Sequence, residues 1–295
     1  MIDLTSQEEI KKLDPKNVFG STKMLLDQCE QIWNDAKSFS LPSEYKNVKN
    51  VVFSGMGGSA LGAQVVLHLY KDSLSLPFSI NNDYSLPEFA NEDTLVILSS
   101  YSGSTEETLA TAQDALKRKC KITAITTGGE LSEFMLKNNL PYLKFDPKNN
   151  PCGQPRLGTG YSVFGTIAIL VKAEILTIDE NQLNASIALV RQDNQMLRNE
   201  AIKLANSLVN RIPVIFASEF LVGAAHVMRN QFNETAKSFS AYSPLPELNH
   251  HLLEGLKNPK DKNLTVFFLE SDLYTDKLKK RMDLTKEVVG KNEIE

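Results

Sequence analysis

The sequence contains few cysteines, little net charge and no long apolar run. Its 295 residues include only three cysteines, Cys29, Cys120 and Cys152, which are widely spaced and form no CxxC motif. This number and spacing fit neither a disulfide framework nor a zinc site, so we expect reduced structural thiols. A formal net charge of −4 argues against a nucleic-acid-binding surface, because a phosphate backbone requires clustered Lys and Arg. Any anionic ligand must therefore be bound by local groups.

Targeting and membrane-spanning segments are not evident either. MIDLTSQEEIKKLDPKN, at residues 1–17, is polar and charged and lacks the apolar stretch of a secretory signal. Because no apolar run is long enough to cross a bilayer, the sequence predicts a cytoplasmic protein without membrane contact. With 42% hydrophobic and 23% charged residues it has an ordinary globular composition, and it is long enough for two domains.

Two loops rich in serine and glycine follow short apolar runs. The first lies in VVFSGMGGSALG at residues 51–62, and the second in LVILSSYSGSTEET at residues 95–108. Each segment passes from a strand-like run through small residues into a helix-like pattern. A helix N-terminus has unpaired N–H groups and partial positive charge, so hydroxyl-rich loops at this position are suited to a phosphate group. Because ligands of open α/β sheets lie at the carboxyl ends of strands, we expect both loops to flank one crevice.

These loops also have other interpretations. Glycine and serine are common in turns, and a Ser or Thr before a helix is usually only an N-cap. Gly55, Gly57 and Ala60 fit a relaxed dinucleotide-binding fingerprint, and Asp83 follows the next strand-like run, where a ribose-binding acid would stand. That interpretation does not account for the second loop, so we rank it behind phosphate binding.

The chain alternates between strand-like and helix-like patterns from residue 49 to residue 150. Strands are predicted at residues 50–54, 77–81, 94–99, 121–126 and 141–145, with helices near 59–70, 105–118 and 130–138. Several strands are continuous apolar runs, as expected when helices cover both faces of a parallel sheet. One further helix is predicted before the sheet, over residues 14–39. We therefore predict an N-terminal helix plus a doubly wound α/β domain within residues 1–152.

The second half, residues 153–295, is predicted to hold connecting helices and another α/β domain. A loop rich in Pro and Gly separates the two halves. The predicted elements are helices at 161–175, 179–208 and 219–236 and strands at 212–217, 238–241 and 264–269. Three parallel strands would leave a long exposed edge, which proteins normally cover. We therefore expect this domain to be incomplete at its C-terminus.

Candidate catalytic residues occur in this second half, including the loop at its start. Glu234 and His250 are separated by a predicted strand and a loop, and a carboxylate with an imidazole suits proton transfer between a general base and an acid. However, a glutamate at a helix end is usually only solvated, and His250 could cap the next helix. His250 and Glu254 could also bind a metal, but a third ligand at suitable spacing is lacking. Arg156, in the loop, could stabilise an oxyanion or be an ordinary surface arginine.

Five motifs together resemble one family. GMGGSALG, SYSGSTEET, QPRLG, NQFNETAK and PELNHH are similar in type and order to motifs of the bifunctional phosphoglucose/phosphomannose isomerases, which contain two sugar isomerase (SIS) domains. The resemblance runs from residue 49 to residue 284 and implies two doubly wound parallel-sheet domains with three αβα layers. It also implies interconversion of glucose 6-phosphate and mannose 6-phosphate with fructose 6-phosphate through a cis-enediol, without a metal or an organic cofactor.

The resemblance also implies roles for individual residues. The residues implied to bind the sugar phosphate are Ser59, Ser100, Ser102 and Thr105. Gly57 and Gly58 are implied to let the backbone approach the phosphate closely. Arg156 would offset the negative charge of the enediolate. Glu234 would move a proton between C1 and C2, and His250 would assist ring opening. In related isomerases this histidine is contributed by the other subunit of a homodimer.

The sequence departs from the family pattern in two places. Thr235 follows Glu234 where the family commonly has Asn, and family members continue beyond the position of Glu295 with a strand, a helix and a segment carrying a catalytic lysine. The resemblance therefore implies no catalytic lysine in this sequence and a second SIS domain that is truncated at its C-terminus. An alternative function is a sugar-phosphate-binding or regulatory SIS protein without catalysis.

Overall fold

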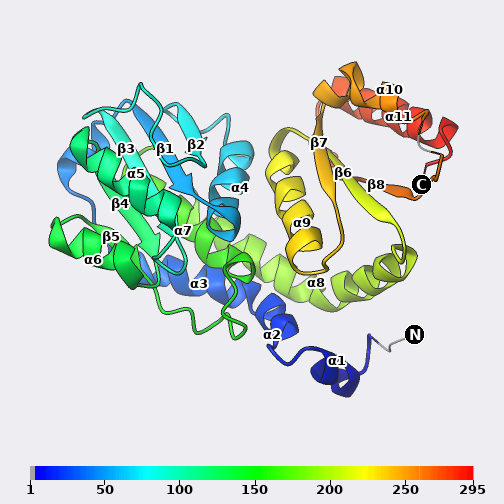
Figure 1. Cartoon of the computed structure of the whole chain (residues 1–295), viewed down its shortest axis with the longest axis horizontal. Coiled ribbons are helices and arrows are strands. Elements are labelled where there is room, and N and C mark those ends of the chain that lie inside the picture. Colours follow the sequence, from blue (N-terminus) through cyan, green and yellow to red (C-terminus); the bar gives the residue numbers. More distant parts are fainter. Residues whose placement is uncertain (1–3, 259, 295) are drawn as a thin grey trace. The chain divides into compact units, whose positions relative to one another are not determined.

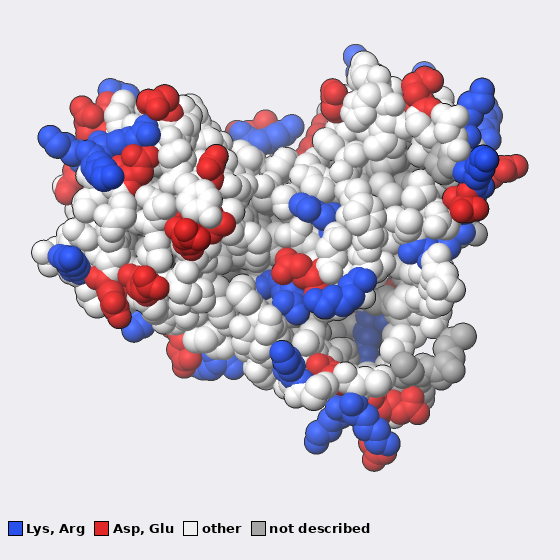
Figure 2. Space-filling model, in the orientation of Figure 1, with Lys and Arg blue, Asp and Glu red and all other residues white. Residues whose placement is uncertain are grey.

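The chain forms two compact units, Met1–Arg191 and Gln192–Glu295. The computed structural model describes residues 4–258 and 260–294 (Figure 1). Within these ranges, no helix has both the length and the apolar character that a membrane span requires. On the face shown in Figure 2, basic and acidic side chains are interspersed and do not gather into one area of a single sign.

Three helices precede the sheet of the first unit: α1 (Gln7–Leu13), α2 (Val18–Lys23) and α3 (Leu25–Asp35). The single helix predicted over residues 14–39 is therefore wrong. Asp14 accepts hydrogen bonds from the N–H groups of Val18 and Phe19 at 2.8 and 2.7 Å, and it fixes the start of α2 at residue 18. Met24, with φ −92° and ψ 10°, then separates α2 from α3.

The sheet of the first unit has five parallel strands in the order β2-β1-β3-β4-β5 (Figure 1). The strands are β1 (Asn50–Gly55), β2 (Phe78–Asn81), β3 (Thr94–Ser100), β4 (Lys121–Thr126) and β5 (Tyr142–Lys144). Each strand overlaps the run predicted for it. All seven residues of the central β3 are buried, which is the pattern expected when both faces of a parallel sheet are covered.

Helices cover both faces of this sheet. They and the short 3₁₀ turns are η1 (Ser43–Lys46), η2 (Gly57–Ala60), α4 (Leu61–Leu69), α5 (Glu106–Lys117), α6 (Gly129–Lys137), η3 (Pro155–Leu157) and α7 (Thr159–Lys172). Phe53 and Ile97 pack in a core that includes α3, α4 and α7, whereas Val52 and Leu98 pack in a second core with α5 and α6. Because alternate strand residues face opposite cores, the unit is a doubly wound, three-layer α/β fold.

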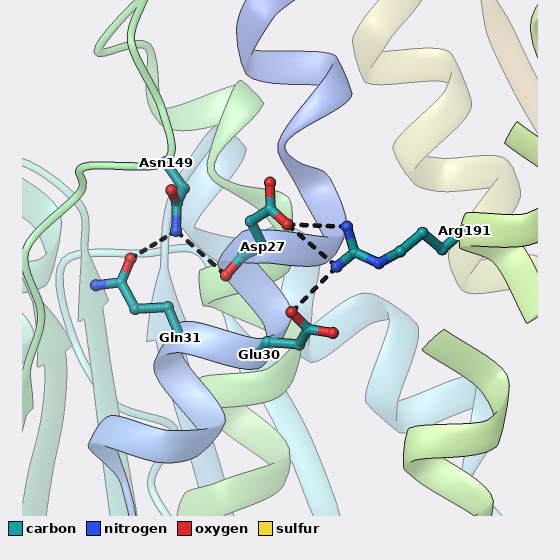
Figure 3. A network of polar contacts seen from close by, with 5 residues as sticks. All are labelled: Asp27, Glu30, Gln31, Asn149 and Arg191. Atoms are coloured by element: carbon teal, nitrogen blue, oxygen red, sulfur yellow. Dashed lines mark hydrogen bonds and ion pairs between the residues drawn. The ribbon is translucent and has the colours of Figure 1, made fainter. Parts of the chain in front are cut away.

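The first unit extends beyond the boundary predicted at residue 152. Tyr161 of α7 is fully buried, and its ring stacks on Phe145 with centroids 4.5 Å apart. The next helix, α8 (Glu180–Ser207), begins in this unit as well. There Arg191 forms ion pairs with Asp27 and Glu30 of α3 at 3.1 and 3.0 Å (Figure 3). Side chains of the predicted connecting helices thus contribute to the core and surface of the first unit.

The second unit has a smaller parallel sheet, with strand order β7-β6-β8. Its elements after α8 are β6 (Ile212–Ser218), η4 (Glu219–Leu221), α9 (Val222–Glu234), β7 (Ala241–Leu245), η5 (Glu247–His250), α10 (Leu252–Gly255), β8 (Leu264–Phe268) and α11 (Asp276–Lys291). The strand predicted at 238–241 begins three residues late, because Asn233 holds Ser240 at the end of α9 by two hydrogen bonds of 2.9 and 3.4 Å. The protein is therefore α/β with two parallel sheets.

Candidate functional site

The two serine-rich loops of the first unit lie against each other, as the parallel strand ends predict. Ser59 lies in η2, directly after β1, and is 8% exposed. Its hydroxyl accepts a hydrogen bond from the N–H of Tyr101 at 2.9 Å, and its carbonyl accepts one from the Ser99 hydroxyl at 2.9 Å. The loop after β1 is therefore joined to the loop after β3 at the carboxyl edge of the sheet.

Hydroxyl groups also fix the shape of the second loop. The Ser100 hydroxyl accepts a hydrogen bond from the N–H of Gly103 at 3.0 Å and bonds the Thr105 hydroxyl at 2.8 Å. Ser100 is fully buried, whereas Ser102 is exposed and bonds the hydroxyl of Ser104 at 3.1 Å. Ser100 thus shapes the loop from inside, and Ser102 presents its hydroxyl on the outer side.

The N-terminus of α5 is the second source of anion-binding groups. Thr105 occupies the N-cap position, but its hydroxyl bonds Ser100 and does not cap the helix. The first N–H groups of α5 are thus left for another acceptor, although Glu106 and Glu107 in the first turn oppose a second negative charge. Their field raises the pKa of the nearby Tyr84, with Glu106 the largest cause. An anion here would have to be held by directed hydrogen bonds and not by net positive charge.

Gly58 allows the segment that carries Arg156 to lie directly on the first loop. A Cβ atom at Gly58 would meet the backbone nitrogen of Arg156 at 2.5 Å and its Cα at 2.8 Å. The family resemblance implied that Gly58 lets the backbone approach a ligand closely, and in the structure its missing side chain makes room for the backbone of η3. Gly57, with φ +49°, supplies the left-handed conformation at the start of η2. The three segments that carry candidate anion-binding groups therefore meet in one unit.

Other polar residues that sequence analysis missed hold this arrangement in place. Asn150 donates hydrogen bonds to the Tyr101 hydroxyl and to the carbonyl of Gln154, both at 2.9 Å. Gln154 in turn accepts a hydrogen bond from the Arg156 guanidinium at 3.0 Å. Ser162 of α7 donates to the carbonyl of Ser59 at 3.1 Å. Asn150 and Ser162 lie far in sequence from Tyr101 and Ser59, which they contact, and only the QPRLG motif gave a signal for any residue of this group.

The equivalent turn of the second unit has different chemistry. Its central strand β6 also runs into a 3₁₀ turn and a helix, and Glu219, with φ +45°, stands at the position that corresponds to Gly57, with φ +49°. A carboxylate at this turn would repel a phosphate group. We therefore place the candidate anion site in the first unit only.

Glu234 and His250 belong to the second unit. Glu234 is the last residue of α9 and is partly buried, and its carbonyl accepts a hydrogen bond of 2.6 Å from the Lys237 ammonium. His250 ends η5 and is exposed, although Leu248 of the same turn is fully buried. The described residues contain no group of three His, Cys, Asp or Glu that could hold a metal, so the proposed pairing of His250 with Glu254 gains no third ligand.

The three cysteines should differ in reactivity. Burial raises the pKa of Cys29 to about 12 and that of Cys120 to about 11, and Cys152 is less buried than either. Because a raised pKa leaves little thiolate at pH 8, we expect iodoacetamide to label Cys152 first and the other two only after unfolding in guanidinium. Peptide mass mapping over time measures this order. Early labelling of Cys29 in the folded protein would contradict it.

Comparison with known protein families agrees with this architecture. Residues 44–133 match the family model of the SIS domain, and residues 197–295 match the bacterial phospho-glucose isomerase C-terminal SIS domain. Solved structures with a similar fold include a hypothetical protein from Thermus thermophilus, with a TM-score of 0.69, 18% identity and coverage of 96% of this chain and 79% of that chain. Another is the C-terminal domain of glucosamine-fructose-6-phosphate aminotransferase from Francisella tularensis, with a TM-score of 0.59 and 16% identity. The match covers 92% of this chain and 81% of that chain. The fold and the matches define a protein with two SIS domains, the class that includes phosphosugar isomerases.

Curated relatives identify the family more closely. The bifunctional phosphoglucose/phosphomannose isomerase of Caldicellulosiruptor bescii is 32% identical over 287 residues, which cover 92% of this chain and 82% of the relative. The enzyme of the same name from Aquifex aeolicus is 29% identical, and the match covers 88% of this chain and 81% of the relative. The chain belongs to the bifunctional phosphoglucose/phosphomannose isomerase family. The D-glucosamine-6-phosphate 4-epimerase of Sulfolobus acidocaldarius is also similar, at 28% identity, and the match covers 83% of this chain and 76% of the relative.

Proposed function

We propose that this protein interconverts glucose 6-phosphate and mannose 6-phosphate with fructose 6-phosphate through a cis-enediol. The observation that carries the proposal is the meeting of two hydroxyl-rich loops and the Arg156 segment at the carboxyl edge of one sheet. A phosphate group needs several directed donors, and this edge offers hydroxyls, backbone N–H groups and a helix N-terminus. Membership of an isomerase family supports the same reaction class.

In this proposal the loops bind the phosphate end of the sugar. The donors are the hydroxyls of Ser59, Ser102 and Thr105 and the first N–H groups of α5. Ser100 also binds the phosphate once the hydrogen bond between the Ser100 and Thr105 hydroxyls opens. Arg156 carries the positive charge that stabilises the enediolate oxygens. Gly57 and Gly58 keep the backbone of the first loop free of side chains.

The proton transfers are assigned to the second unit. Glu234 acts as the base that moves a proton between C1 and C2, and His250 assists ring opening, in line with the NQFNETAK and PELNHH motifs. The exposure of His250 suits a residue that serves a site on another subunit, so we propose a homodimer in which His250 crosses the interface. Proton transfer of this kind requires neither a metal nor an organic cofactor.

The test is a ¹H NMR assay with fructose 6-phosphate in the presence of EDTA. We expect signals of both glucose 6-phosphate and mannose 6-phosphate to appear and to reach the same equilibrium from either aldose. Saturable binding of fructose 6-phosphate without conversion would instead support the alternative, a sugar-phosphate-binding or regulatory SIS protein.

A second candidate reaction follows from the similarity to the Sulfolobus epimerase. An epimerase would act on D-glucosamine 6-phosphate at C4, a position that the proton transfer between C1 and C2 does not reach. The same NMR assay with D-glucosamine 6-phosphate separates the two, because only epimerisation changes the coupling pattern of H4. Conversion of this amino sugar without conversion of fructose 6-phosphate would replace the proposed function.

A further inference from the structure

The side chain next to His250 is held by two residues of α11. Asn249 donates a hydrogen bond from Nδ2 to the hydroxyl of Thr285 at 2.8 Å, and its Oδ1 accepts one from Nη1 of Arg281 at 3.2 Å. The Thr285 hydroxyl in turn donates to the carbonyl of Arg281 at 2.8 Å. Since a guanidinium can only donate, the amide of Asn249 has one possible orientation in this arrangement. We call Arg281, Asn249 and Thr285 the α11 clamp.

The α11 clamp connects an exposed turn to a rigid core. Thr285 is 2% exposed, and Leu248, Met282 and Val289 around it belong to one buried apolar cluster. His250, one residue beyond the clamp, is exposed and lies at the end of a 3₁₀ turn of four residues. Short 3₁₀ turns have weak hydrogen-bond geometry and little stability of their own. The backbone position of His250 therefore depends on how firmly Asn249 is held.

The guanidinium of Arg281 donates a hydrogen bond to Asn249 and is therefore not only a solvated surface group. Arg281 lines an open cavity of about 370 Å³ together with Lys277, Lys280 and Leu284. The two lysines are exposed, whereas the Arg281 guanidinium turns to the Asn249 carbonyl oxygen. The cavity also leaves room for a substituted side chain at position 281 without overpacking.

We propose that Arg281 and Thr285 are positioning residues for His250. This inference rests on the proposed function, in which His250 assists ring opening, and it adds the two residues that fix the turn from which the imidazole projects. A misplacement of about 1 Å can lower a reaction rate about 100-fold even when the substituted residue is far from the chemistry. Release of Asn249 should therefore slow the step that uses His250 without changing phosphate binding.

Thr285→Val removes the hydroxyl at nearly constant volume, and Arg281→Met removes the guanidinium. We expect either substitution to lower kcat about 10- to 100-fold with KM within about twofold of wild type. Thr285→Ser, which keeps the hydroxyl, should restore most of the rate. Lys280→Met removes a positive charge beside the same cavity and should leave kcat unchanged. Equal losses in Thr285→Val and Thr285→Ser would contradict the role of the hydroxyl bond.

A double-mutant cycle separates positioning from a merely structural role. In a His250→Ala background, Thr285→Val should change kcat less than about twofold, because no imidazole remains to be positioned. An equal loss in both backgrounds would overturn the inference.

The imidazole signals of His250 give a readout that is independent of turnover. In ¹H–¹³C NMR spectra we expect them to shift or broaden in Thr285→Val and to remain unchanged in Lys280→Met. Unchanged signals in Thr285→Val would overturn the inference whatever the activity. If the wild type converts no sugar phosphate, the proposed function fails, and the NMR result still decides whether the α11 clamp holds His250.

Discussion

Glu234→Gln should lower kcat for fructose 6-phosphate by a factor of about 10² to 10⁴. The amide keeps the size and most of the hydrogen-bonding capacity of the carboxylate, but it cannot accept the proton that leaves C1 or C2. Glu234 ends α9 and is only partly buried, so the substitution should not disturb the core of the second unit. KM should remain close to the wild-type value, because the proposed phosphate-binding groups lie in the first unit.

The proton transfer can be measured directly. In D₂O the wild type should incorporate deuterium at C2 of the aldose, and Glu234→Gln should show almost no incorporation. Glu200→Gln is the matched control, because Glu200 is exposed on α8 and its ion pair with Lys203, at 2.6 Å, is a surface contact worth little energy. Turnover close to wild type in Glu234→Gln would remove this residue from the proposed mechanism.

The sheet of the first unit was predictable because its strands are buried on both faces. Val51, Val52 and Phe53 form one apolar run and residues 95–98 another, and such runs bounded by Gly and Ser are typical of central parallel strands. The contact between the two serine-rich loops followed from the same topology, because adjacent parallel strands end at one edge. These features depend on local pattern and were therefore accessible from sequence.

Features that depend on distant contacts were not predictable in this way. Tyr161 joins α7 to the first unit through Phe145 and through a hydrogen bond of 2.8 Å to Gln31, and these residues are far apart in sequence. The role of Gly58 depends in the same way on the backbone at Arg156. The role of Thr105 depends on Ser100, because its hydroxyl bonds Ser100 and does not form the N-cap bond that was the alternative interpretation of such a residue. Sequence pattern thus indicated candidate residues by type, and long-range packing determined what each of them contacts.

Gly103→Ala should destabilise the first unit by about 2 to 5 kcal/mol. Gly103 has φ +73°, where an alanine costs about 1 to 2 kcal/mol, and its new Cβ would overlap the carbonyl oxygen of Gly128. That oxygen is part of the backbone and accepts a hydrogen bond from the Thr126 hydroxyl at 3.0 Å, so relief requires movement of both loops at a further cost of about 1 to 3 kcal/mol. The melting temperature of this unit should fall by about 4 to 20 °C, as measured by differential scanning calorimetry.

Gly290→Ala provides a control of the same chemistry with the opposite expected sign. Gly290 lies in α11, and among the described residues a Cβ at this position would meet no atom within 4 Å other than those of its chain neighbours and its own helix backbone. Alanine should therefore stabilise α11 by up to about 1 kcal/mol through helix propensity. If Gly103→Ala also left the melting temperature unchanged, the tight contact between the loops at Gly103 and Gly128 would not exist in solution. The phosphate-binding shape proposed for the Ser100 to Thr105 loop would then lose its structural basis, because that shape depends on the left-handed turn at Gly103.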